Sequence, residues 1–219
     1  MTDGFERMVD EARVFFAELA ENNSKAWFEP QKERYKEEIA KPAALFADLI
    51  AEDLARITGK AHHPKVFRIY RDVRFSKDKT PLKAHQHVLW SPGDKTALRP
   101  AWFWGISPDY FIVGLGLMGL SSDQLTRYRA LVDQSGDALE DAFDQAKATG
   151  AQFGQWRAEP LKRVPKPYPA DHPHAELLKQ KGFTISAPIS DGWRARGVLK
   201  ATLERIADLK PIWEVFNGS

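Results

Sequence analysis

Near the start of the chain, apolar residues recur every three or four positions, which predicts an amphipathic helix. Its buried face would hold Phe5, Met8, Val9, Ala12, Phe15, Phe16 and Leu19. The polar run 21–24 interrupts the pattern, and a second helical phase follows over residues 35–57. We expect Pro30 in the first turn of this second helix and a kink or restart at Pro42 with the same face buried. Gly59 should end it.

The middle of the chain changes to patterns that are typical of strands. Strands are expected over residues 66–70, 87–90, 101–107 and 110–117, and a further one over 183–187. The turn sequence Ser107-Pro108-Asp109 should join two of them as a hairpin. Because both faces of this hairpin are apolar, we place it in the centre of the sheet, covered on both sides.

Helical patterns return after the hairpin. Ser121 and Gln124 have the spacing of a capping box, and Ser135 can cap a following helix. A short helix is expected over residues 175–179, and a final amphipathic helix over 192–210 that Pro211 ends or bends. The economical fold is a single α+β domain over residues 1–219. It has an antiparallel β-meander of about five strands, flanked by N-terminal, middle and C-terminal helices.

Composition narrows the possible chemistry. The 219 residues include no cysteine, which excludes disulfides, thiolate zinc sites, iron–sulfur clusters and cysteine nucleophiles. No apolar run approaches the ~18 residues that cross a bilayer, and the acidic N-terminus does not match a secretory signal. We therefore expect a cytoplasmic protein that does not enter a membrane.

Positive charge is concentrated in residues 65–87. This stretch has seven Lys or Arg residues against Asp72 and Asp78, a net charge of +5, while the whole chain carries only +2. Arginine forks and lysine ammonium groups bind phosphate or carboxylate, which predicts an anion site. Its candidate ligand-binding residues are Arg68, Arg71, Asp72, Arg74, Ser76, Lys77, Lys79 and Lys83. The alternative is a structural network in which the two aspartates tie the basic loop to itself.

A second basic segment, residues 159–181, contains Lys162, Arg163 and Lys166 among five prolines. A loop stiffened in this way can hold side chains for a ligand or cover an edge of the core. We predict that these three residues contribute to the same site as the first basic stretch.

The six histidines form three close pairs, at 62–63, 85–87 and 172–174. His-x-His on a strand places both rings on one face, and Asp78 or Asp171 could complete a metal site. The surrounding cations argue against this, so we expect neither a metal nor a cofactor. His85 and His172, each near a carboxylate, are the candidate catalytic acids or bases, with Asp78 and Asp171 as candidate partners.

The run Gly114-Leu-Gly116-Leu-Met-Gly119 matches a dinucleotide-binding fingerprint. That site requires a parallel strand after the following helix, whereas residues 121–148 have the pattern of two helices. We expect these glycines to allow close packing of a neighbouring chain segment.

Several stretches resemble a family known as domain of unknown function 2461. The longest runs from Phe67 to His85 and reads Phe-Arg-x-Tyr-Arg-Asp-x-Arg-Phe-Ser-x-Asp-Lys-x-Pro-x-Lys-x-His. Shorter matches lie at 15–19, 22–28, 161–166 and 171–173, so the resemblance spans about residues 10–210. The resemblance implies no assigned activity. It implies only that the two basic segments are both part of the family's common pattern. Leu82 and Pro167 stand where the family pattern has Tyr and Gly, which argues against a role for a tyrosine or a flexible backbone there.

Together these features favour a protein with a cationic pocket for an anionic, phosphate-bearing small molecule. They leave open whether it is an enzyme, and they say nothing of its oligomeric state. A nucleic-acid-binding module is the weaker alternative, because the net charge is low and the cations occupy short segments. A third alternative is an interaction protein that docks an acidic partner through the basic stretch.

Overall fold

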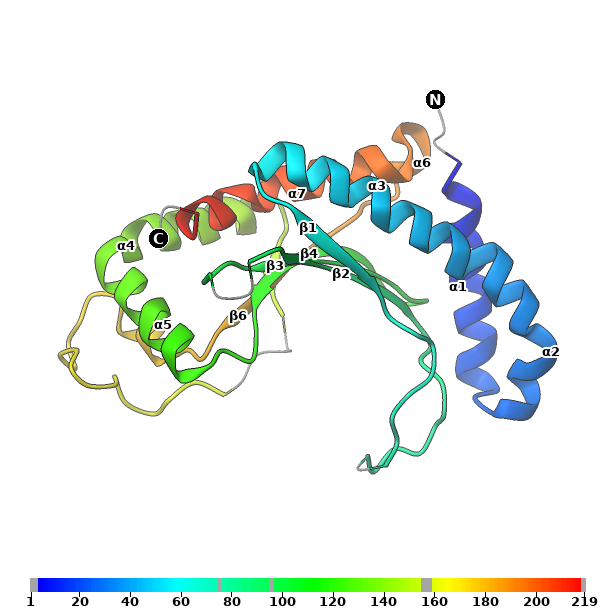
Figure 1. The fold of residues 1–219 in the computed structure, drawn as a ribbon, viewed down its shortest axis with the longest axis horizontal. Helices are drawn as coiled ribbons and strands as arrows, with labels where there is room; N and C mark the ends of the chain where they lie inside the picture. The colour runs from blue at the N-terminus through cyan, green and yellow to red at the C-terminus, as the bar shows by residue number, and fades with distance from the viewer. Residues whose placement is uncertain (1–3, 75, 95–96, 155–158, 218–219) are drawn as a thin grey trace. The chain divides into compact units, whose positions relative to one another are not determined.

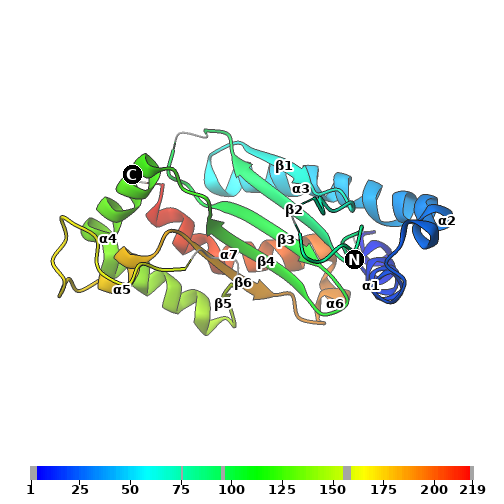
Figure 2. The ribbon, with the colours of Figure 1, turned by 90° about the horizontal axis from the view of Figure 1, so that it is seen from below.

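The computed structural model describes residues 4–74, 76–94, 97–154 and 159–217 (Figures 1 and 2). The fold is α+β, as predicted, with helices flanking an antiparallel sheet. The sheet has six strands in the order β1-β2-β3-β4-β6-β5. Their bounds are β1 His62–Val66, β2 Gln86–Pro92, β3 Ala101–Ile106, β4 Phe111–Leu117, β5 Gln152–Phe153 and β6 Phe183–Pro188. The sixth strand, β5, was not predicted; it has only two residues and pairs with β6 at the edge.

The chain forms two compact units, and each is assembled from separate segments. The first unit contains Met1–Gly93, Phe103–Val113 and Ile189–Leu203; the second contains Asp94–Trp102, Gly114–Pro188 and Glu204–Ser219. Strands β3 and β4 therefore each have residues in both units. A single domain over residues 1–219 stays a prediction.

The N-terminal helices belong to the first unit. Helix α1, Glu6–Glu21, buries the apolar face that the sequence predicts. Helix α2, Lys25–Tyr35, folds back along α1 (Figure 1) and is capped by Ser24, whose Oγ accepts a hydrogen bond of 3.2 Å from the Trp27 N–H. Pro30 lies inside α2, so its predicted place at the start of the next helix is wrong. The Ser24 cap starts the helix earlier, and burial of Phe28 and Tyr35 offsets the hydrogen bond that proline cannot donate.

The predicted irregularity at Pro42 is a π-helical turn. This turn, η1, spans Lys36–Ala40 and leads directly into helix α3, Lys41–Thr58. The wider turn accommodates a proline, which has no N–H to donate. Ile39, Phe46 and Ile50 are fully buried on one face across the irregularity, as predicted. Gly59 ends α3 in the left-handed conformation with φ of 68°.

The first strand is displaced from its predicted position. β1 occupies residues 62–66 and pairs with β2, so that His62 lies opposite Pro92 and Val66 opposite Val88. Pro64 obscured the signal, because proline is tolerated in a strand only at an edge position such as this one. Within the predicted strand 66–70, Tyr70 makes only an isolated antiparallel bridge, with Leu82.

Residues 67–74 and 76–85 form an irregular two-stranded extension, which we call the basic arm. Figure 1 shows it extending beyond the ends of β1 and β2. Backbone hydrogen bonds tie its two sides, from the Lys83 N–H to the Ile69 carbonyl at 2.8 Å and from the Arg71 N–H to the Pro81 carbonyl at 2.9 Å. Helix α3 packs against β1 and β2 at the base of the arm.

The second unit contains helix α4, Ser122–Ala148, and the short helix α5, Ala175–Lys179. The predicted capping box is present, since the Gln124 N–H donates to Ser121 Oγ and the Ser121 N–H to Gln124 Oε1. Ser135 has non-helical torsions (φ −137°, ψ 26°), so α4 consists of two helices that meet at a kink there, which confirms the two predicted helices.

Gly116 allows close approach of backbone, as expected. A Cβ atom there would lie 2.5 Å from the Phe183 carbonyl oxygen on the neighbouring strand β6. The strand after α4 is β5, which pairs antiparallel with β6. This topology lacks the parallel βαβ unit of a dinucleotide-binding fold.

Two C-terminal helices replace the one that was predicted. Gly197, with φ of 90°, separates α6, Trp193–Arg196, from α7, Val198–Val215. Pro211 lies inside α7, so of the two predicted alternatives, an end or a bend, the helix end at Lys210 is wrong. Burial of Ile212, Trp213 and Phe216 after the proline favours continuation of the helix. In the part of the chain that the structure describes, no helix is both long and apolar enough to cross a membrane.

Candidate functional site

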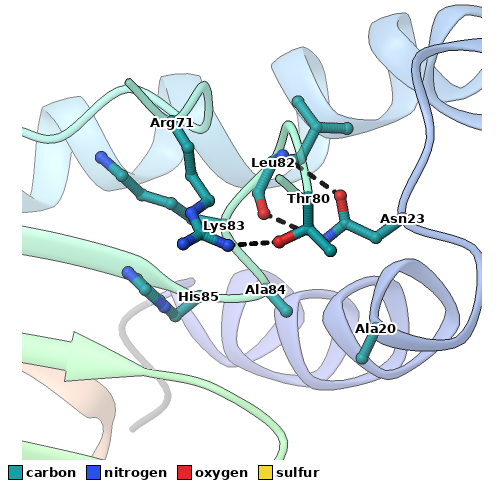
Figure 3. A pocket seen from close by; sticks show the side chains of 8 residues that line it. All are labelled: Ala20, Asn23, Arg71, Thr80, Leu82, Lys83, Ala84 and His85. Atoms are coloured by element: carbon teal, nitrogen blue, oxygen red, sulfur yellow. Dashed lines mark hydrogen bonds between the residues drawn. The ribbon is translucent and has the colours of Figure 1, made fainter. Parts of the chain in front are cut away.

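A pocket of about 440 Å³ lies where the basic arm meets helix α1 (Figure 3). It is lined by Ala20, Asn23, Arg71, Thr80, Leu82, Lys83, Ala84 and His85. All of these residues belong to the first unit. The pocket thus joins the C-terminal end of α1 and the α1–α2 turn to both sides of the arm.

Asn23 fixes the arm against the helices. Its side-chain amide donates to the Leu82 carbonyl at 2.9 Å and accepts from the Leu82 N–H at 3.1 Å. The Leu82 side chain is buried, and the Phe28 and Tyr70 rings pack edge to face beside it with centroids 5.8 Å apart. The amide of Asn23 therefore pairs with the arm as a neighbouring strand would, and it holds the pocket wall in place.

Arg71 links the two sides of the arm. Its Nη1 donates to both Asp78 and Thr80, a contact visible in Figure 3 for Thr80. Asp78 also accepts hydrogen bonds of 2.9 Å from the Thr80 N–H and hydroxyl. The Arg71 guanidinium and then these two Thr80 donors lower the pKa of Asp78 to about 2. Asp78 is therefore ionised at neutral pH and serves to order the arm.

The tip of the arm contains a second ion pair, between Arg74 and Asp72. Arg74 Nε and Nη2 donate to the two carboxylate oxygens at 3.0 and 2.7 Å, and this lowers the pKa of Asp72. Lys79 Nζ donates to the Val73 carbonyl at 3.0 Å. The predicted structural network thus exists in part, but it is exposed, with Arg74 at 77% side-chain accessibility.

The remaining predicted ligands of the arm also lie outside the pocket lining. Arg68 and Lys77 are exposed and Ser76 is half-buried. Phe75, which belongs to the long motif, lies outside the residues that the structure describes. Of the eight predicted ligands in the arm, the pocket lining contains Arg71 and Lys83.

Positively charged side chains surround Lys83 and His85. Lys83 Nζ donates to the Arg68 carbonyl at 2.9 Å and lies 5.6 Å from the centre of the Phe67 ring. Burial, followed by the charges of Arg68, Lys65 and Arg71, lowers the pKa of Lys83. Burial and the charges of Lys83 and Arg71 lower the pKa of His85 to about 4. His85 is therefore a neutral imidazole at physiological pH, and cations rather than the predicted carboxylate surround it.

Behind His85 lie two polar groups that the sequence did not single out as site residues. The His85 and His87 rings stack with centroids 3.9 Å apart, as expected for alternate residues on one face. His87 Nε2 lies 2.6 Å from the Tyr110 hydroxyl in a hydrogen bond. Burial, then His85 and Lys83, lowers the pKa of His87 to about 3, and burial raises that of Tyr110 to about 12. The His-x-His spacing signalled His87, whereas no local signal identified Tyr110.

The second basic segment belongs to the second unit, where Lys162, Arg163 and Lys166 are all exposed. The segment is joined to α5 by a hydrogen bond of 2.8 Å from the Leu161 N–H to the Lys179 carbonyl. That it shares one site with the basic arm stays a prediction.

His172 has a carboxylate neighbour, but it is Asp133 on α4 instead of Asp171. His172 Nδ1 accepts a hydrogen bond of 3.1 Å from the His174 N–H, so its proton is on Nε2, which lies 2.9 Å from Asp133 Oδ1. Asp171 itself is exposed. The pair thus anchors the loop before α5 to helix α4.

Fold and site define an α+β protein with a cationic pocket at the base of a β-arm. A family model described as "Conserved hypothetical protein (DUF2461)" matches residues 11–214. The chain belongs to this family, which confirms the resemblance in the two basic segments. No curated protein and no solved structure gives a significant match to the sequence.

Proposed function

We propose that the pocket at the base of the basic arm binds a small anionic molecule, most simply one that carries a phosphate group. The observation that carries this proposal is the excess of positive charge in the pocket lining. Arg71 and Lys83 line it, and among the described residues no acidic side chain does. Lys83 forms no ion pair with any described carboxylate, and burial, followed by the charges of its neighbouring cations, lowers its pKa. A bound anion would relieve this repulsion.

The donor groups suit a phosphate or carboxylate. The hydrogen bonds of Arg71 to Asp78 and Thr80 both use Nη1, and Nε and Nη2 donate to none of the described residues. These two N–H groups form the edge of the guanidinium that binds two oxygens of one anion. The Asp78 contact holds that edge in place, since it fixes the guanidinium plane.

His85 adds a group that can respond to the bound anion. A neutral imidazole both donates and accepts a hydrogen bond. A phosphate near it would favour the protonated form and raise its pKa from about 4. His85 is therefore the residue best placed to exchange a proton with a ligand, if a reaction follows binding.

The size of the pocket favours a small molecule over a polymer. Its volume of about 440 Å³ lies within the ~300–1,000 Å³ that is common for small-ligand sites. Nucleic acid or an acidic protein would instead use the exposed cations at the arm tip, such as Arg74 and Lys77, which lie outside the pocket.

The proposal is tested by titrating pyrophosphate into the purified protein and into two charge-matched variants. Lys83→Gln removes a charge inside the pocket, and Lys77→Gln removes the same charge from the arm tip. We expect Lys83→Gln to weaken binding at least about 10-fold, equivalent to ~1.4 kcal/mol, and Lys77→Gln to change it by less than about twofold. The measurement is isothermal titration calorimetry at 150 mM salt.

Equal weakening in both variants would mean that the arm attracts anions only through its overall charge, and the pocket proposal would fail. It would also fail if the unmodified protein bound no pyrophosphate, phosphate or nucleotide. Tight binding of single-stranded oligonucleotides that weakens mainly in Lys77→Gln would favour the nucleic-acid alternative.

A further inference from the structure

A second cluster of polar residues lies in the second unit, at the break in helix α4. His174 packs directly on the helix backbone at Gly136, where a Cβ atom would come within 2.1 Å of the imidazole Cδ2. The His174 side chain is only 8% accessible. Glycine after the non-helical Ser135 is therefore what lets the imidazole lie against the helix.

Two carboxylates from the turn after the break face this imidazole. His174 Nδ1 lies 3.3 Å from Glu140 Oε2, and Nε2 lies 3.5 Å from Asp137 Oδ1. One nitrogen of His174 and one oxygen each of Asp137 and Glu140 all lie within 4.8 Å of one another. These donors come from residues i and i+3 of one helix and from the loop packed against it.

The buried nitrogen of His174 lacks a hydrogen-bond partner. Nδ1 is inaccessible to solvent, and no residue in the described part of the chain forms a hydrogen bond with it. Such a nitrogen is costly to bury unless something else satisfies it. Its 3.3 Å separation from Glu140 Oε2 matches the ~3.3–3.5 Å between two ligands that each lie about 2.0–2.1 Å from one tetrahedral zinc ion.

The surroundings also favour a cation. The Asp133–His172 pair and the hydrogen bond from the His174 N–H to His172 Nδ1 hold the loop on the helix before any ion binds. Acidic residues dominate this part of α4, with Lys147 the single basic residue among positions 130–148 of the sequence. The pair of His85 and His87 has cations as its charged neighbours instead.

We propose that His174, Asp137 and Glu140 bind a divalent transition-metal cation, with Zn²⁺ the first candidate. One imidazole nitrogen with two carboxylate oxygens suits Zn²⁺, Co²⁺ or Mn²⁺, whereas Ca²⁺ and Mg²⁺ prefer oxygen ligands alone. Three protein ligands leave a fourth position for water. The site uses no residue of the basic arm and does not depend on the anion-binding proposal.

The test is a titration of chelator-treated protein with Zn²⁺ by calorimetry and with Co²⁺ by visible absorption. Glu140→Gln and Asp137→Asn each remove one ligand from an exposed position, so both should fold. Asp141→Asn makes the same change of charge at the exposed position directly after Glu140 and is the matched control. We expect one ion per chain, binding weakened at least about 10-fold in the first two variants, and unchanged binding in the control.

His174→Gln adds a direct test of the nitrogen ligand, and its circular dichroism shows whether the fold survives. Absence of Zn²⁺ and Co²⁺ binding by the unmodified protein would overturn the proposal. So would equal affinity in Glu140→Gln, Asp137→Asn and Asp141→Asn, because the ion would then bind at another histidine pair.

Discussion

Replacing His87 with glutamine should make the fold less sensitive to acid. His87 is largely buried beneath His85 and forms a hydrogen bond with the Tyr110 hydroxyl. Burial, and secondarily the charges of His85 and Lys83, lowers its pKa from 6.5 to about 3. Glutamine keeps an amide near Tyr110 but does not titrate in this range.

The direction of the effect follows from the two pKa values. Because the pKa of folded His87 lies below that of the unfolded chain, the unfolded chain binds the additional proton between about pH 6.5 and pH 3. The neutral His87 therefore contributes stability that is complete above about pH 6.5 and is lost as the pH falls towards about 3.

The size of the effect follows from the same linkage. Within this window the free energy of unfolding falls by up to ~1.4 kcal/mol per pH unit for one histidine, or ~2 kcal/mol between pH 7 and pH 5. His85, whose pKa is about 4, is more exposed, and we reduce its share to about 1 kcal/mol for solvent screening. The unmodified protein should thus lose ~3 kcal/mol from the pair between these pH values, and His87→Gln only ~1 kcal/mol.

Urea unfolding followed by tryptophan fluorescence measures this difference, because the chain has seven tryptophans. Free energies of unfolding are compared at pH 7 and pH 5 for the unmodified protein and for His87→Gln. His63→Gln, which changes an exposed histidine on β1, is the control and should behave as the unmodified protein does. If His87→Gln lost as much stability between pH 7 and pH 5 as the unmodified protein, His87 would not be held neutral by the fold and the reasoning would be refuted.

Two further substitutions test the contacts that support the proposed sites. Gly136→Ala should lower the free energy of unfolding by ~2 kcal/mol in urea unfolding, against the usual gain for alanine in a helix, because the new Cβ would meet His174; a neutral or stabilising result would contradict the packing described. Asn23→Ala should lower it by ~2 kcal/mol, since both backbone groups of Leu82 lose their partner. Hydrogen exchange should then be faster at the Leu82 amide, and unchanged protection there would show that Asn23 does not fix the arm.

The parts of the fold that depend on neighbouring residues could be predicted from the sequence. The α1 face, the Ser121–Gln124 capping box and the Gly59 helix end each follow from a few adjacent residues. The first strand was misplaced because its position depends on pairing with β2, far along the chain, and Pro64 hid its local signal. Pro30 and Pro211 do not end their helices, since buried apolar residues on both sides of a proline can maintain a helix.

The sequence indicated where in the chain the pocket lies, but it did not identify all of the residues that line it. The dense positive charge marked the arm, and Arg71, Lys83 and His85 do line the pocket. Asn23 lies 59 residues from its partner Leu82, so no local pattern could connect them. The carboxylates near His174 were missed for the same reason, because the loop that holds His174 packs on a helix more than 30 residues earlier.

The way the chain divides between the two compact units restricts how they can be separated. The chain crosses from one unit to the other after Gly93, Trp102, Val113, Pro188 and Leu203. No truncation at one peptide bond yields either unit intact, and neither can be transplanted into another gene as one contiguous block. Protease nicks within 94–188 would leave fragments that each hold part of both units. Either unit can therefore be produced whole only from a chain that also carries most of the other.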